Sequence, residues 1–157
     1  MQKTNAIRLL EKAKIPFETK EYEVDESDLS GTHVAECVNL PPEIVFKTLV
    51  ARGDKNGLCV FCIPCAEELD LKKAAKVSGN KKIEMLPLKE LLPTTGYIRG
   101  GCSPVGMKKK LPTFVHSTAV NYEKFAVSGG ARGIQLFLSP KDLISFVGAS
   151  CEDIIKD

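Results

Sequence analysis

Residues 99–112 read RGGCSPVGMKKKLP, and this stretch organises the rest of the chain. Three glycines and one proline fall within seven residues, so the backbone can reach conformations that other residues avoid. Pro104 fixes its own φ and pushes Ser103 toward an extended conformation. Such a loop can direct several N–H groups at one point, which suits an anion or a developing oxyanion. The alternative is an ordinary turn that follows a strand ending at Tyr97-Ile98.

The lysines at 108–110 belong to a larger basic region. Between residues 70 and 110 the chain has ten basic and three acidic side chains, so the remainder is net negative although the whole chain carries +2. If the basic side chains converge beside the glycine-rich loop, they form a patch that attracts phosphate. If they are spread over the surface, they are ordinary solvated charges. Both interpretations are compatible with the sequence.

Helical and strand patterns alternate on both sides of the loop. The length of 157 residues and the absence of a linker or repeat predict one domain, residues 1–157. Mixed elements with tight strand connections predict an α+β fold with a mixed sheet. Helices are expected from Thr4 to before Pro16 and over 31–38, 70–77, 87–92 and 139–147, and strands over 17–24, 44–51, 58–64, 83–86, 113–116, 125–128 and 134–138.

Composition narrows the setting in which the chain works. The chain has no run of 18 apolar residues, which argues against a membrane span. The first residues, MQKTNA, lack the apolar core of a signal peptide, so we expect a cytoplasmic protein. In that compartment the six cysteines should be thiols.

Three of the cysteines form the run Cys59-x-x-Cys62-x-x-Cys65. Part of an iron–sulfur ligand set has this spacing, which allows a metal or redox protein as one hypothesis. The surrounding residues, LCVFCIPC, are instead typical of a buried strand. In a strand, Cys59 and Cys65 point to one face and Cys62 to the other. Cysteine also packs as a small apolar side chain, so core packing is the preferred interpretation.

Most familiar catalytic arrangements are absent from the sequence. The two histidines, His33 and His116, lack the spacing of a zinc hydrolase, and we expect both at the surface. No nucleophile elbow and no nucleotide-binding glycine motif occurs. Cys102 is either a nucleophile beside basic residues or a small filler residue. Together these features favour a site that positions and polarises its ligand.

Lys47 interrupts the apolar strand IVFKTLVA at 44–51. A lysine among apolar neighbours either reaches the surface from an edge strand or meets an anionic partner. The functional interpretation is a cation held at the mouth of a pocket.

Five segments, together and in this order, resemble the YbaK/EbsC family, the free-standing relatives of the editing domain of prolyl-tRNA synthetases. The resemblance covers essentially the whole chain. It implies an α+β domain whose mixed, barrel-like sheet is surrounded by helices. The segments are VFKTLV (45–50), ELDLKKAAK (68–76), KKIEM (81–85), TGYIRGGCSPVGMKKKLPT (95–113) and VSGGARG (127–133).

The resemblance also implies an activity. Members cleave the ester of mischarged aminoacyl-tRNA, and the best-known branch is similar to a Cys-tRNA(Pro) deacylase. There the substrate's own thiol attacks the ester carbonyl, and the cysteine is released as a cyclic thiolactone. This reaction requires no cofactor and no protein nucleophile. The expected partners are the 3′ end of aminoacyl-tRNA and prolyl-tRNA synthetase, with no membrane and no DNA. Lyase or hydrolase chemistry depends on whether the thiol or water attacks.

The resemblance assigns roles to individual residues. Lys47 would bind the terminal adenosine or its phosphate, and the backbone of Gly100, Gly101 and Cys102 would stabilise the oxyanion. Where the better-known branch has an acidic residue this chain has Gln135, and Leu29 or Ser30 replaces a rim aromatic. Both differences leave the amino acid open, with alanine or another small residue as the alternative. A non-catalytic aminoacyl-tRNA binding module is the competing hypothesis. The other expected substrate-binding residues are Tyr22, Thr48, Ser103, Pro104, Ser128, Gly129 and Gly130.

Overall fold

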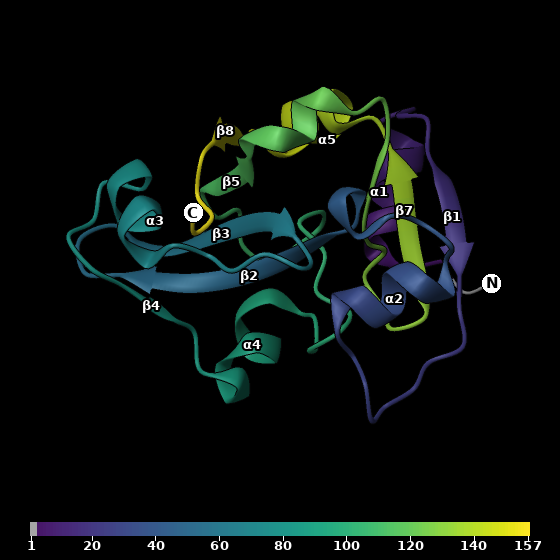
Figure 1. Cartoon of the computed structure of the whole chain (residues 1–157), viewed down its shortest axis with the longest axis horizontal. Coiled ribbons are helices and arrows are strands. Elements are labelled where there is room, and N and C mark those ends of the chain that lie inside the picture. Colours follow the sequence, from purple (N-terminus) through teal and green to yellow (C-terminus); the bar gives the residue numbers. More distant parts are fainter. Residues whose placement is uncertain (1–2) are drawn as a thin grey trace.

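The structure, a computed structural model, describes residues 3–157 and contains two β-sheets flanked by five helices (Figure 1). One sheet has the order β4-β2-β3-β5-β8 and the other the order β1-β7-β6. Parallel and antiparallel pairs occur in the larger sheet, which confirms the predicted mixed α+β fold. The strands are β1 (Glu18–Glu21), β2 (Phe46–Gly53), β3 (Gly57–Pro64), β4 (Ile83–Met85), β5 (Thr113–His116), β6 (Phe125–Ser128), β7 (Ile134–Leu138) and β8 (Ser150–Glu152).

The two sheets meet where β2 begins. A single parallel bridge joins Val45, immediately before β2, to Ala126 in β6. Within residues 3–157 the strands do not close into one barrel, so the barrel-like shape implied by the resemblance is not confirmed. In Figure 1 the β2–β3 hairpin extends from the three-stranded sheet toward helix α3 at the other end of the molecule. The helices are α1 (Asn5–Lys12), α2 (Gly31–Cys37), α3 (Leu71–Val77), α4 (Leu88–Thr95) and α5 (Pro140–Val147), with 3-10 turns at Pro42–Ile44 and Ser117–Asn121.

The β2–β3 hairpin separates two apolar cores. Phe46 and Val50 face one core together with Cys62, whereas Cys59 and Phe61 face the other. Burial on both faces explains the nearly continuous apolar sequence of these strands. The expectation that Cys59 and Cys62 lie on opposite faces is confirmed, and both thiols pack in the core.

The predicted helix starts are confirmed by their caps. The side chains of Thr4, Asp70 and Ser139 each accept a hydrogen bond from a backbone N–H in the first turn of α1, α3 and α5. Helix α4 differs, because it continues past Pro93 to Thr95 and ends at Gly96, whose φ is +86°. The expected strand at Tyr97-Ile98 is therefore wrong: the glycine-rich loop follows a helix.

His116 differs from the expectation that both histidines lie at the surface. His116 is only 3% exposed, and its Nδ1 atom accepts a hydrogen bond from the Ile154 N–H at 3.3 Å. Burial lowers the pKa of His116, although the charge of Asp153 opposes the shift. His33 is half-buried. Helices long and apolar enough to cross a membrane are absent from residues 3–157.

Candidate functional site

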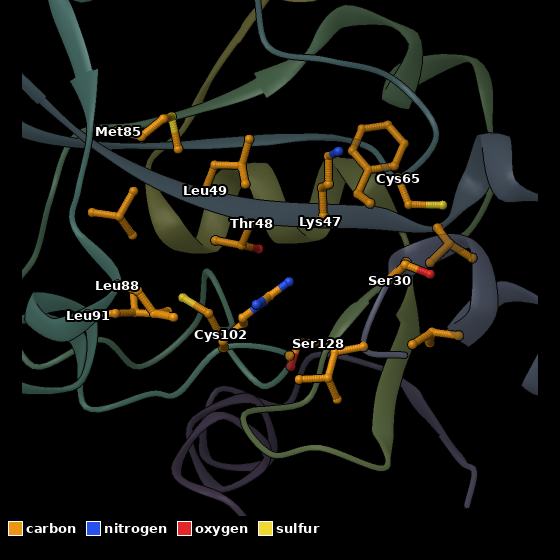
Figure 2. A pocket seen from close by; sticks show the side chains of 18 of the residues that line it. Ser30, Lys47, Thr48, Leu49, Cys65, Met85, Leu88, Leu91, Cys102 and Ser128 are labelled. Carbon is orange, nitrogen blue, oxygen red and sulfur yellow. The ribbon is translucent and has the colours of Figure 1, made fainter. Parts of the chain in front are cut away.

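A cavity of about 440 Å³ lies between the start of β2, the N-terminal end of α2, helix α4 and the glycine-rich loop (Figure 2). Apolar side chains form most of its wall, and a few polar groups face the same space. This composition is typical of a small-ligand site. The lining includes Leu29, Ser30, Val34, Lys47, Thr48, Met85, Leu88, Leu91, Arg99, Gly100, Cys102, Ser128 and Gln135.

Strand β2 contributes Lys47 and Thr48 from its free edge. Figure 2 shows Thr48 on the side of the strand that faces Cys102, and Lys47 with Leu49 on the opposite side. The strand register agrees, because Lys47 pairs with Ile63 and Thr48 with Cys62. Lys47 is half-buried and has no ion-pair partner within 4.0 Å among residues 3–157. Its ammonium group is available at the rim.

The glycine-rich loop supplies fewer free N–H groups than expected. Gly101 donates its N–H to the carbonyl of Ile98 at 2.9 Å, so this group is already used. A Cβ atom on Gly101 would lie 3.0 Å from the backbone of Ala131 and Arg132, which explains the need for glycine there. Gly100, with φ of +83°, and Cys102 both line the cavity. Within the described chain their N–H groups have no acceptor.

The thiol of Cys102 is a poor nucleophile at neutral pH. The side chain is buried, and desolvation raises the pKa of the thiol to about 11, with a partly opposing hydrogen bond to Thr95. Thiolates, rather than thiols, attack electrophiles. The environment therefore favours the filler interpretation of this cysteine. Residues 3–157 also contain no group of three His, Cys, Asp or Glu side chains arranged to hold a metal ion.

Gln135 is the most distinctive polar group of the cavity. It lies opposite Ser128 in the β6–β7 pair and is 5% exposed. Its Oε1 atom has no hydrogen-bond partner among residues 3–157. A buried acceptor without a partner costs about 1–3 kcal/mol, which a ligand donor would recover. Ser128 accepts a hydrogen bond from the Gly130 N–H at 3.2 Å.

The remaining five predicted site residues are not among those that line the cavity. Ser103 is fully buried, and its Oγ atom accepts a hydrogen bond from the Val105 N–H. Gly129 donates to the Ile134 carbonyl at 2.9 Å and closes the β6–β7 hairpin. Gly130 packs against Tyr97. Tyr22 and Pro104 are likewise outside the cavity lining, and Pro104 lines a second cavity.

The apolar wall was not predicted from the sequence, whereas the basic region follows the second of the two alternatives considered for it. Met85 on β4 is 43% exposed and Leu88 on α4 is 60% exposed. Both large apolar side chains therefore face solvent at the cavity instead of packing in the core. Of the basic residues between 70 and 110, only Arg99 lines this cavity. Lys73 instead pairs with Asp153 and Asp157 at the C-terminal end. The basic side chains thus do not gather into one patch around the cavity.

Comparison with known proteins gives a consistent result. The sequence model of a family described as "Aminoacyl-tRNA editing domain" matches residues 30–146. A protein of Enterococcus faecalis named "Putative Cys-tRNA(Pro)/Cys-tRNA(Cys) deacylase EbsC" is 49% identical over 98% of this chain and 93% of its own length. A solved structure described as "a putative trans-editing enzyme for prolyl tRNA synthetase" is 25% identical, with a TM-score of 0.85 over 100% of both chains. A structure of a hypothetical protein has a TM-score of 0.88 over 98% of this chain and 100% of its own, but at 19% identity it shows the fold alone.

Proposed function

Because the chain belongs to the aminoacyl-tRNA editing domain family, we propose that it is a deacylase that cleaves the ester of mischarged tRNA. The favoured substrate is Cys-tRNA(Pro), which is among the substrates in the name of the relative that is 49% identical. The whole described chain acts as one editing domain. Its partners are the 3′ end of the charged tRNA and prolyl-tRNA synthetase, and its compartment is the cytoplasm, where such tRNA is used.

The observation that carries the proposal is the set of unused polar groups in the cavity. An aminoacyl ester brings a cationic α-ammonium donor and a carbonyl oxygen that becomes negative during cleavage. The orphaned Oε1 atom of Gln135 suits the ammonium group. The free N–H groups of Gly100 and Cys102 suit the oxyanion. The adjacent apolar wall accommodates a small side chain.

Lys47 is assigned to the RNA end of the substrate. Its ammonium group lies at the rim, on the side of β2 away from Thr48 and Cys102. From there it would bind the terminal adenosine or its phosphate and hold the ester toward the loop. Lys47 positions the substrate in this scheme and does not act as a base.

In the proposed reaction the substrate thiol is the nucleophile. Its sulfur bonds to the ester carbonyl carbon, and the bond from that carbon to the ribose oxygen breaks. The thiol proton ends on the ribose hydroxyl, so the products are uncharged tRNA and a cysteine thiolactone. This route fits a cavity whose own thiol, Cys102, is held protonated by burial.

The test is release of amino acid from Cys-tRNA(Pro), Ala-tRNA(Pro), Ser-tRNA(Pro) and S-methylated Cys-tRNA(Pro). Cleavage of the free-thiol substrate alone is expected and would support attack by the thiol. Cleavage of the alanine or serine esters would keep the deacylase but require water as nucleophile. Tight binding without cleavage of any ester would refute the enzyme and favour the binding module.

A further inference from the structure

A second cavity, of about 240 Å³, is lined in part by the second half of the glycine-rich loop. Its lining comes from residues 104–113 and from the C-terminal end of α5. The wall contains Lys109 and Lys110, and no acidic side chain. We call this site the basic groove; it is lined by Pro104, Gly106, Met107, Lys109, Lys110, Leu111, Thr113, Phe146 and Val147.

The two lysines of the basic groove are free to bind an anion. Both are exposed, and neither has a carboxylate within 4.0 Å among residues 3–157. The Nζ atom of Lys110 lies 3.9 Å from the position that a Cβ atom would take at Gly148, immediately after α5. Lys110 and Phe146 line the same groove.

Phe146 does not belong to the face of α5 that packs in the core, and its large apolar ring is exposed. Leu143 of α5 is fully buried, whereas Phe146 remains 38% exposed in the groove. Met107, Leu111 and Val147 give the groove an apolar surface beside this ring. An exposed aromatic ring beside unpaired lysines is the combination by which proteins hold unpaired nucleotides, with the base stacked and the phosphate on the cations.

We propose that the basic groove is a second RNA-binding subsite, in which Lys109 and Lys110 bind a backbone phosphate and Phe146 stacks an unpaired base. This inference rests on the proposed function, because the ligand is the RNA of the substrate. The loop of residues 99–112 connects the subsites: Cys102 lines the first cavity and Pro104 the groove. Ser103 between them is fully buried.

The experiment measures binding of uncharged tRNA(Pro) by fluorescence anisotropy at several salt concentrations. A K109A/K110A variant is expected to bind about tenfold more weakly at 0.1 M salt, and the slope of log K against log salt should fall by about 1, because one phosphate contact is lost. The matched control K81A/K82A loses the same charge from exposed lysines before β4, outside both cavities, and should change binding less than about twofold.

Phe146 is tested separately. Phe146→Ala should weaken binding about tenfold without changing the salt slope, and Phe146→Trp should restore it, because stacking needs an aromatic face. The proposal is overturned if the two double-lysine variants weaken tRNA binding equally, or if Phe146→Ala binds tRNA as tightly as the parent. The groove would then be assigned to binding another protein. Thermal unfolding of each variant establishes that the exposed substitutions leave the fold intact.

These results do not depend on catalysis. Uncharged tRNA contains no ester, so the binding test stands even if the chain cleaves no charged tRNA. Conversely, ester cleavage of a cysteinyl-adenosine, which lacks the rest of the RNA, should be the same in K109A/K110A and in the parent. A loss of cleavage on that minimal ester would also overturn the assignment of the groove to the RNA.

Discussion

Replacing Gln135 by methionine tests two roles of its unpaired oxygen separately: its penalty for folding stability and its contribution to binding the substrate. The side chain is 5% exposed, and its Oε1 atom has no partner in the described chain. Methionine has a similar length and no group that needs a hydrogen bond. Removing an unsatisfied buried oxygen returns part of a penalty of about 1–3 kcal/mol. We expect the free energy of unfolding to rise by about 1 kcal/mol, and Tm by about 2–4 °C.

The same substitution should damage the reaction. A hydrogen bond to a charged group contributes about 1.5–3 kcal/mol, so kcat/KM for the aminoacyl ester should fall by roughly 10- to 150-fold. A change that stabilises the fold and impairs activity is typical of a site that keeps polar groups for its ligand. Thermal unfolding and single-turnover deacylation measure the two effects.

Thr118 provides a matched control for this variant. Its Oγ1 atom is the other buried side-chain oxygen or nitrogen without a partner in residues 3–157, and Thr118 does not line the cavity. Thr118→Val should therefore be neutral or stabilising and leave kcat/KM unchanged. If Gln135→Met lowers the free energy of unfolding by more than about 1 kcal/mol, the oxygen has a partner in the folded protein and the reasoning is refuted.

Three further predictions concern Lys47, Cys102 and His116. Lys47→Ala should lower deacylation by about 100-fold or more with Tm unchanged, because a misplaced ester loses the proximity effect; comparable cleavage by parent and variant would contradict the positioning role. Cys102→Ala should retain most of the activity. At pH 7.5 an alkylating reagent should modify the exposed Cys37 and Cys151 well before Cys102, because burial raises the pKa of the Cys102 thiol to about 11. Rapid alkylation of Cys102 would contradict the burial of its thiol. The pKa of His116 in the folded state lies below its ordinary 6.5, so the unfolded chain binds more protons. The stability that neutral His116 contributes is therefore complete above about pH 6.5. It is lost as the pH falls through the lower folded pKa. Tm measured from pH 7 to 5 should fall less steeply in His116→Asn than in the parent, and parallel profiles would exclude this histidine as the cause.

The site illustrates how far local patterns reach. Lys47 was recognisable as a charge inside an apolar strand, and Gly100 as part of a loop able to present N–H groups. In the structure Lys47 and Thr48 point to opposite sides of β2. An edge strand was one of the two placements considered for Lys47, but the sequence pattern does not decide between them, and in the structure both residues line one cavity. Edge position depends on which strands pair, and β4 pairs only with the far end of β2.

Local sequence accounts for the features that depend on neighbours within a few residues. Thr4, Asp70 and Ser139 cap helices because each side chain reaches N–H groups two or three residues away, and the apolar run around Cys59 and Cys62 forms a strand buried on both faces. The ordered segments also identified the family.

How distant groups share or compete for partners follows from the tertiary structure alone. His116 is buried against Ile154, and the Oε1 atom of Gln135 is left without a donor. Burial and hydrogen-bond satisfaction depend on segments far apart in the chain, so no local pattern encodes them. The chemistry proposed for this protein rests on these long-range outcomes.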